Sequence, residues 1–393
     1  MHAGPASQRP GRPPTTTQFM KDEYPDSKSD LFAAFIERCT NFAVPRGAVA
    51  MITMQSWMFL SSYAKLRVSL LAHQQIASML HLGARAFDSI GGEVVSSTAF
   101  VLSNKPSKRA GSFVRLVDGN SEAEKVSELR AALDARTSES DFYQASGSDF
   151  ASIPGTPIVY WLSEKMRGSF ATGNPLSEVA NLRQGLATAD NNRFLREWWE
   201  VSQERSAFGC TSREEAVASG ARWFPYNKGG EFRKWYGNQE HVVNWEDDGA
   251  EIRTFGTEDG GRPRSRAQNT DTYFSPSVSW SKVSSGAPAF RAYPAGFIYD
   301  VAGTSIFATT SQQRAGLLSF ANSRVAFEQL AAIAPTLNYE VGQVAGLPMA
   351  DASAEDGVSL AGRAIDVARS DWDSFETSWG FARNPLVELT ERG

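Results

Sequence analysis

The sequence has few residues that could bind a metal or form disulfides. It contains two cysteines, Cys39 and Cys210, and four histidines, and none of these residues is spaced from another as metal ligands usually are. Disulfide frameworks and thiolate or imidazole metal sites depend on close, regular spacing. We therefore expect two core thiols and no metal site.

Long apolar runs and an excess of positive charge are also missing. No run approaches the roughly 20 residues that a membrane-spanning helix needs, and residues 1–8 lack the pattern of a secretion signal. These absences predict a cytoplasmic protein without membrane contact. The chain has 39 Lys and Arg against 44 Asp and Glu, a net charge of -5, which excludes the overall basic balance of small DNA-coating proteins. Any contact with nucleic acid must come from a local patch.

The sequence does have enough apolar residues for more than one core. Its 393 residues are 41% hydrophobic, which favours two domains. Residues 1–20 are rich in Pro, Gly, Thr and Arg and predict a disordered tail. From about residue 142 the composition shifts toward Gly, Asn, Trp and Tyr. We therefore expect one domain over residues 21–140 and a second over residues 141–393.

The first of these domains alternates helical and strand patterns. Ser29 or Asp30 is a plausible N-cap for a helix over 31–42, and the run 48–54, apolar on both faces, predicts a buried parallel strand. A helix opening at Ser61 or Ser62 carries Leu66, Leu70, Ile76 and Leu80. Strands are expected over 94–102 and 112–117 and a surface helix over 122–136, which together predict a doubly wound α/β sheet.

The second domain has shorter segments and fewer regular patterns. Helices are expected near 312–334 and over 361–379. Between them and the first domain lie irregular stretches rich in Trp, Tyr and Gly. A mixed α+β domain is the expectation.

Six blocks of the sequence occur in a specific order and spacing: EYPDSKSDLFAAFIERC, GAVAMITMQSWMFLSSYAKLR, FDSIGGEVVSSTAFVL, GLATADNNRFLREWWEV, YNKGGEFRKWYGN and LNYEVGQVAGLP. Together these blocks resemble the BREX-type adenine-specific DNA methyltransferases, a phage-defence family. The resemblance implies the rear part of a Rossmann-like class I methyltransferase sheet, followed by a target-recognition domain that binds double-stranded DNA. It also implies S-adenosylmethionine as methyl donor and other BREX defence proteins as partners.

Two motifs that this family needs for chemistry do not occur in the sequence. In the family, an Asn/Asp-Pro-Pro-aromatic loop accepts hydrogen bonds from the adenine amine, and a Gly-rich turn holds the donor. The nearest strings, at Asn174-Pro175 and Asn384-Pro385, lack the second proline and the aromatic residue. We therefore expect an N-terminally truncated fragment whose partner is the missing N-terminal half.

The resemblance also suggests residues for the target-base and donor sites. Asp30 and Phe32 are expected to border the donor pocket, or simply to belong to a packed helix. Gln55 and Trp57 follow the buried strand, where open α/β sheets bind ligands. Phe87 matches the position at which similar enzymes stack an aromatic ring on a flipped adenine. For Gln55, Trp57 and Phe87, ordinary packing is the alternative.

One segment of the second domain interleaves basic and aromatic residues. Gly229 and Gly230 would permit close approach of its backbone to phosphate. The alternatives are an aromatic mini-core under a solvated loop, or DNA contact through a second, arginine-containing loop with Arg262, Arg264 and Arg266. The residues predicted to contact DNA are Tyr226, Lys228, Arg233, Lys234 and Trp235.

Two functions remain open from the sequence. One is the rear part of a DNA methyltransferase, inactive until its front half is supplied. The other is a non-catalytic DNA-binding or interaction remnant of such an enzyme. A self-standing hydrolase has no support, because no nucleophile elbow is present.

Overall fold

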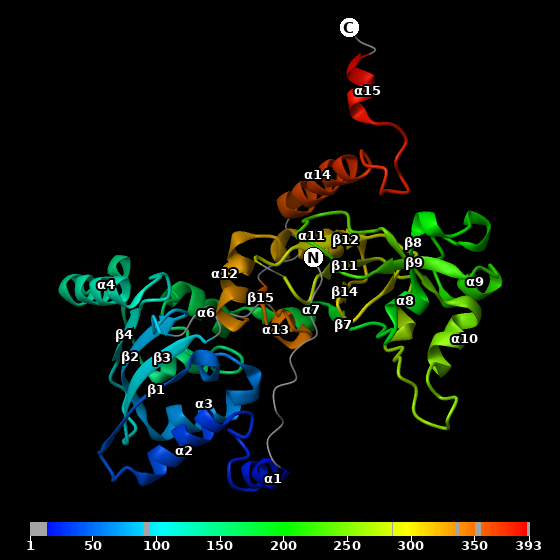
Figure 1. The fold of residues 1–393 in the computed structure, drawn as a ribbon. Helices are drawn as coiled ribbons and strands as arrows, with labels where there is room; N and C mark the ends of the chain where they lie inside the picture. The colour runs from blue at the N-terminus through cyan, green and yellow to red at the C-terminus, as the bar shows by residue number, and fades with distance from the viewer. Residues whose placement is uncertain (1–13, 90–94, 285, 335–337, 350–354, 391–393) are drawn as a thin grey trace. The chain divides into compact units, whose positions relative to one another are not determined.

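The computed structural model describes residues 14–89, 95–284, 286–334, 338–349 and 355–390. The chain divides into two compact units, residues 1–171 and 172–393 (Figure 1). This division lies later than the predicted boundary after residue 140. The reason is that strand β5 (Phe142–Ala145) and the buried Tyr160 still belong to the first sheet and its core.

Unit 1 contains a five-stranded mixed sheet in the order β1-β3-β2-β4-β5. β3 is antiparallel to both neighbours, β2 and β4 are parallel, and β5 is antiparallel to β4. The other strands are β1 (Ala48–Met54), β2 (Gln75–Gly83), β3 (Ser97–Ser103) and β4 (Gly111–Arg115). The helices are α1 (Pro14–Glu23), α2 (Leu31–Phe42), α3 (Ala64–His73), α4 (Glu122–Ala135), α5 (Gly147–Ala151) and α6 (Glu164–Thr172), with 3-10 turns η1 (Gln55–Met58), η2 (Ser61–Tyr63) and η3 (Ser138–Ser140).

Helices α2 and α4 lie where the sequence predicts them. Asp30 is the N-cap residue of α2, and the Ser121 hydroxyl accepts a hydrogen bond from the amide of Glu124 at the start of α4. On α2, Ala33, Ala34 and Ile36 face the core, while Phe35 is 58% exposed.

Two strand predictions are corrected. The run 48–54 forms β1, but β1 pairs only with β3, antiparallel, and lies at the edge of the sheet in the described part of the chain. The predicted helix beyond residue 61 ends at His73, so that Ile76 and Leu80 belong to β2. In β2 burial changes every second residue along much of the strand, which is the period of a strand and not of a helix.

The predicted tail is only partly within the described residues. Residues 1–13 lie outside them, whereas Pro14–Glu23 form α1, in which Met20 is buried. The prediction of disorder through residue 20 is therefore wrong from Pro14 onward, where the chain is helical.

Unit 2 contains two four-stranded sheets, in the orders β13-β9-β10-β8 and β12-β11-β14-β7, and a two-stranded pair, β15-β6. The strands are β6 (Asn174–Pro175), β7 (Asn181–Arg183), β8 (Leu195–Glu197), β9 (Trp223–Asn227), β10 (His241–Asn244), β11 (Ser277–Trp280), β12 (Phe290–Tyr293), β13 (Ile298–Tyr299), β14 (Ser305–Phe307) and β15 (Pro348–Met349). This confirms the expected mixture of helices and short strands.

The helices of unit 2 are mostly short. The predicted helix over 312–334 is two helices, because Asn322 ends the first and Ser323 caps the second. The last long helix begins at Glu355 and ends at Trp372, earlier at both ends than predicted. The helices are α7 (Leu176–Val179), α8 (Asn191–Phe194), α9 (Arg213–Ala218), α10 (Glu246–Thr254), α11 (Ser311–Ala321), α12 (Arg324–Ile333), α13 (Val341–Ala345), α14 (Glu355–Trp372) and α15 (Pro385–Thr390), with 3-10 turns η4 (Trp198–Glu200), η5 (Gln203–Arg205) and η6 (Thr270–Thr272).

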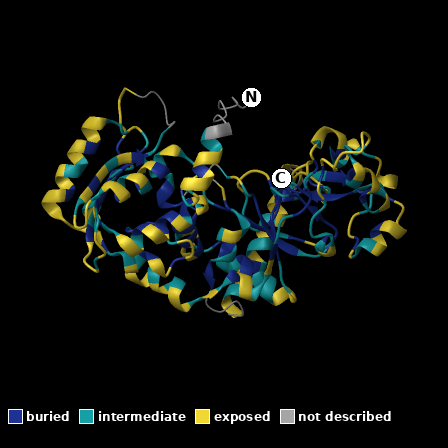
Figure 2. Cartoon of the chain, turned by 90° about the horizontal axis from the view of Figure 1, so that it is seen from below, coloured by how far each residue is buried: buried dark blue, intermediate teal, exposed yellow. Residues whose placement is uncertain are grey.

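The cores of both units are rich in aromatic rings. In unit 1, the Phe113 ring stacks on Tyr160 with centroids 4.7 Å apart. In unit 2, Phe224 and Phe274 pack edge to face within a cluster that also contains Trp245. In Figure 2 the buried residues of both units are dark blue, and the exposed residues, many of them on helices, are yellow. No helix within the described ranges is long and apolar enough to cross a membrane.

Candidate active-site edge and nucleic-acid interface

The carboxyl ends of β1, β2 and β4 meet at one edge of the first sheet. β1 and β2 both run antiparallel to β3, and β4 runs parallel to β2, so the three strands share a direction. Gln55 follows β1 directly, and Phe87 follows β2 in the connection to β3. The topology therefore places two of the predicted target-site residues at the edge where open α/β sheets bind their ligands.

A histidine that the sequence analysis did not select holds Gln55 in place. His81 Nε2 lies 2.8 Å from Gln55 Oε1, and His81 Nδ1 lies 3.1 Å from the hydroxyl of Tyr160. The imidazole also contacts the rings of Phe59 and Trp161, with centroids 5.8 and 5.9 Å away. An isolated histidine inside an alternating strand gives no signal of such a role, so sequence reasoning missed it.

Burial keeps this histidine neutral. His81 is 5% exposed, and desolvation, with smaller effects of Arg115 and Lys125, lowers its pKa from 6.5 to about 4. In a neutral ring one nitrogen donates and the other accepts. The Nε2–H group therefore donates to Gln55, and Nδ1 accepts from Tyr160.

Of the other two residues predicted for the target-base site in unit 1, Phe87 is accessible and Trp57 is not. Phe87 is 37% exposed and can present its ring to a ligand. Trp57 is 1% exposed and packs edge to face on Phe100, 5.1 Å away, so its prediction as a target-pocket residue is corrected to the core. The local reason is the 3-10 turn η1, which rotates Trp57 inward after β1 ends.

The residues predicted to border a methyl-donor pocket lie at the start of α2. Phe32 is half-buried, and its ring centroid is 5.7 Å from that of Tyr63. Asp30 precedes the helix in an extended conformation. A carboxylate and one ring edge do not enclose a nucleoside, and the sequence has no Gly-rich turn to cradle one. These residues alone therefore do not fit S-adenosylmethionine.

In unit 2, the predicted DNA-contact segment is bonded into the fold. Tyr226 is fully buried, and its hydroxyl donates to Asp300 Oδ2 at 2.6 Å. Lys228 Nζ also lies 2.6 Å from the same carboxylate oxygen, which is itself buried. Because Tyr226 has no exposed surface, its prediction as a DNA-stacking residue is corrected. The Lys228 charge is balanced inside the protein.

The rest of that segment has internal partners as well. Arg233 pairs with Asp371 at 2.8 Å and lies over the ring of Trp372. Lys234 Nζ donates to the carbonyl of Asn322 at 3.1 Å. Trp235 is half-buried, and its backbone pairs with β12. The three cations therefore have protein partners that DNA would have to replace.

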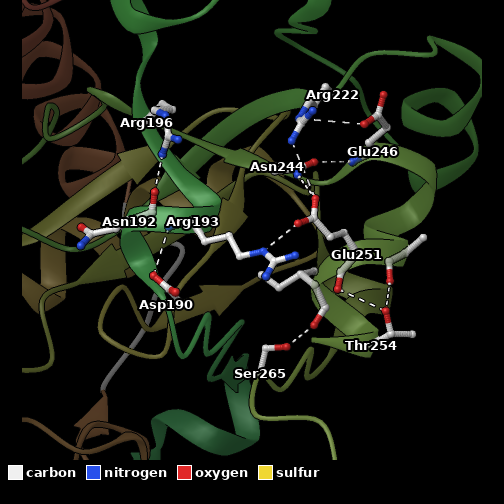
Figure 3. A network of polar contacts seen from close by, with 12 residues as sticks. Asp190, Asn192, Arg193, Arg196, Arg222, Asn244, Glu246, Glu251, Thr254 and Ser265 are labelled. Atoms are coloured by element: carbon white, nitrogen blue, oxygen red, sulfur yellow. Dashed lines mark hydrogen bonds and ion pairs between the residues drawn. The ribbon is translucent and has the colours of Figure 1, made fainter. Parts of the chain in front are cut away.

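A second group of arginines in unit 2 is neutralised in a similar way. Figure 3 shows Arg193 and Arg222 directed toward Glu251, with Arg222 also near Glu246. The Arg193–Glu251 contact is 2.8 Å, and Asn244 donates to the other oxygen of Glu251. This network joins α8, the residue before β9, and β10 to α10, and it leaves little net positive charge.

The loop over residues 256–266 differs from both groups. Arg262, Arg264 and Arg266 are exposed, and no carboxylate within the described residues lies in ion-pair distance of them. The loop is nevertheless anchored. Ser265 is buried and donates to the carbonyl of Ile252, a contact drawn in Figure 3, and the backbone of Arg266 exchanges two hydrogen bonds with Ala187. The structure thus presents three arginines on a fixed backbone.

Comparisons with known proteins agree with this architecture. The family model described as "Eco57I restriction-modification methylase" matches residues 8–87, a stretch that contains Gln55, His81 and Phe87. Among solved structures, the Type IIL restriction-modification enzyme MmeI, determined in complex with DNA, superposes with a TM-score of 0.56 at 12% identity, over 97% of this chain and 50% of that one. This likeness concerns the fold alone.

Curated sequences give a stronger similarity. The chain is 38% identical over 95% of its length to "Adenine-specific methyltransferase PglX" of Lacticaseibacillus casei, of which it covers 31%. It is also 38% identical over 94% of its length to "Adenine-specific methyltransferase BrxX" of Escherichia coli, of which it covers 29%. The resemblance predicted from the sequence is confirmed: over nearly its whole length, this chain corresponds to about a third of an adenine-specific methyltransferase of the PglX and BrxX type.

Proposed function

We propose that this chain is the rear part of a phage-defence DNA methyltransferase that transfers a methyl group from S-adenosylmethionine to the exocyclic amine of adenine. The supporting observation is 38% identity over 95% of the chain to PglX, although the chain spans only about a third of that relative. In this proposal, unit 1 forms one wall of the target-base site and unit 2 is the target-recognition domain on double-stranded DNA. The other BREX proteins remain its proposed partners.

The chemistry itself is proposed to come from another polypeptide segment. The sequence holds neither the acceptor loop nor the Gly-rich turn, and Asp30 and Phe32 do not enclose a donor. The proposed contribution of this chain is to position the target base. Phe87 offers an exposed ring edge for a flipped base, and the amide of Gln55 is oriented by His81.

For DNA contact, the arginine loop of residues 256–266 replaces the segment around residue 230 as the favoured site. Lys228, Arg233 and Lys234 already have protein partners, whereas Arg262, Arg264 and Arg266 are exposed on an anchored backbone. Guanidinium groups bind phosphate and the edges of guanine well, because their donors form a planar fork.

The experiment is reconstitution of activity. The chain is mixed with the part of the L. casei PglX that lies outside its match to this chain, and transfer of labelled methyl groups to duplex DNA is measured. We expect adenine methylation from the mixture and background levels from either part alone. The absence of methylation from a folded mixture that binds DNA would favour the alternative, a non-catalytic DNA-binding remnant.

A further inference from the structure

The connection after β2 that carries Phe87 has a backbone that must be held in place. β2 ends at Gly83, which has a φ of 66°, and a Cβ atom there would lie 3.0 Å from the Cα of Val117. Two residues later, Arg85 has a φ of 54°, in the left-handed region that residues other than glycine seldom adopt. Such a backbone persists only where the surrounding structure fixes it. The direction of the Phe87 ring therefore depends on what anchors this connection.

Helix α4 anchors the beginning of the connection. Lys125, in the first turns of α4, is 4% exposed, and its Nζ donates to the carbonyls of Leu82 and Leu116 at 2.7 Å each. Leu82 is the last residue of β2 but one, and Leu116 follows β4 directly. A single ammonium group thus ties the carboxyl ends of two parallel strands to the helix.

The first residue of α4 anchors the end of the connection, next to Phe87. The amide of Asp88 donates to Glu122 Oε1 at 2.8 Å, and the amide of Glu122 donates to Asp88 Oδ1 at 3.0 Å. The second bond also satisfies an amide at the start of a helix, where the helix dipole favours a carboxylate. Arg85 Nη1 adds a contact of 3.4 Å to Asn120 Oδ1. The residue that follows Phe87 is therefore bonded to α4 through both its backbone and its side chain.

The reciprocal pair of Asp88 and Glu122 contributes geometry more than stability. Both side chains are exposed, and both carry negative charge. Exposed polar contacts add little to the free energy of folding, because water offers the same groups equivalent partners. Two backbone donors and two carboxylate acceptors nevertheless fix the distance and the relative orientation of the two backbones.

We propose that Asp88 and Glu122 are positioning residues for Phe87, an inference that rests on the proposed function. They hold the ring, which is 37% exposed, in the direction in which a flipped adenine stacks on it. Because the ring is already oriented, it loses little conformational freedom when the base arrives. Neither carboxylate needs to touch the base, since both act through the backbone of the connection.

The first test follows the ring in the whole chain without DNA. The label para-fluorophenylalanine is introduced at position 87, and its fluorine NMR line is recorded in the original chain and in Asp88→Ala and Asp88→Asn. Asp88→Ala should narrow the line roughly twofold, because a released ring moves faster. Asp88→Asn keeps an oxygen that accepts from the Glu122 amide, so its line should stay broad. An equally broad and unshifted line in Asp88→Ala would overturn the inference.

The second test measures methylation by the mixture that tests the proposed function. Asp88→Ala should slow methyl transfer roughly tenfold, toward the rate of Phe87→Ala, and Asp88→Asn should keep most of the rate. Combined with Phe87→Ala, Asp88→Ala should add no further loss, because Asp88 acts only through the ring. Losses that multiply in the double variant would show that Asp88 acts by another route and would contradict the inference.

Two further variants separate positioning from general stability. Glu122→Ala removes the other acceptor of the pair and should reproduce both effects of Asp88→Ala. The matched control is Asp134→Ala, at an exposed position in the last turn of α4, and it should change neither the fluorine line nor the rate. Urea unfolding checks that all three variants are folded. Equal effects of Asp88→Ala and Asp134→Ala would contradict a specific role of the pair.

The outcomes distinguish this inference from the proposed function. A fluorine line that narrows only when the pair is broken, with no methylation by the mixture, supports the positioning role and contradicts the activity. Methylation at the original rate by folded Asp88→Ala contradicts the positioning role and leaves the activity standing.

Discussion

The side-chain oxygen of Gln55 accepts a hydrogen bond from the imidazole of His81 at 2.8 Å, and this contact fixes which way the Gln55 amide points. Because Oε1 is engaged by the ring, the amide nitrogen is directed away from His81. Tyr160 holds the other side of the imidazole at 3.1 Å. Two buried side chains, His81 and Tyr160, thus orient the half-buried Gln55, the polar group that follows β1.

The first prediction concerns pH. The pKa of His81 is about 4 in the folded chain against 6.5 ordinarily, so between these values the unfolded chain binds a proton that the folded chain does not. Stability is therefore fully present above about pH 6.5 and falls as the pH drops toward 4, by roughly 3 kcal/mol. Urea unfolding at several pH values measures it. His81→Phe should flatten the profile in this window, and an unchanged profile would refute the assignment.

The second prediction concerns Arg67, which is 1% exposed and has no carboxylate partner in the described chain. Its guanidinium donates to the carbonyls of Trp57, Leu60, Gly155 and Thr156. Burial lowers its pKa to about 10, so it stays charged at neutral pH. Arg67→Met leaves these carbonyls unsatisfied and should cost roughly 3 kcal/mol or more in urea unfolding.

The matched control for Arg67 is Arg130→Met, at an exposed position on α4. It should change stability by less than about 0.5 kcal/mol. Equal effects of the two substitutions would show that the carbonyl contacts of Arg67 contribute nothing specific.

The third prediction concerns the arginine loop. Each arginine that neutralises a phosphate contributes about 0.9 to the slope of log affinity against log salt on duplex DNA. The triple alanine variant of Arg262, Arg264 and Arg266 should flatten that slope by up to about 2.7. Fluorescence anisotropy at several salt concentrations measures this.

The control for the loop is Arg233→Ala, which removes a cation already paired with Asp371. It should leave the slope nearly unchanged. If Arg233→Ala flattens the slope and the triple variant does not, the DNA surface is the segment around residue 230, as the sequence alone suggested.

The fourth prediction concerns Phe87 in the reconstituted enzyme. Phe87→Ala should remove base stacking of roughly 1–3 kcal/mol and slow methylation, with the fold unchanged because the ring is 37% exposed. Phe87→Tyr keeps an aromatic ring and serves as the matched variant. Methylation at the original rate by folded Phe87→Ala would assign the residue to packing alone.

The elements of unit 1 were largely predictable, because their patterns are local. Asp30 and Ser121 are typical N-caps, and the helices that follow them begin where predicted. What the sequence could not give is the pairing of β1. A run that is apolar on both faces predicts a parallel strand with neighbours on each side, whereas among the described residues β1 has one neighbour, the antiparallel strand β3.

The candidate site was predicted less completely. Gln55 and Phe87 lie at the expected edge, but the orienting role of His81 depends on a contact with Tyr160, 79 positions away in sequence. For the basic segment that contains Lys228 and Arg233, the sequence predicted a site that the fold does not leave available. Its charges looked available for DNA because their partners, Asp300 and Asp371, are distant in sequence and become neighbours only in the fold.

The position of β1 at the edge of the described sheet has a consequence for the behaviour of the chain in solution. The strand contains no charged residue and no proline, and such edges invite pairing between copies, which leads to aggregation and to removal by chaperones and proteases. A charge placed on the exposed face of the strand, at Ile52, is therefore expected to keep more of the chain in solution.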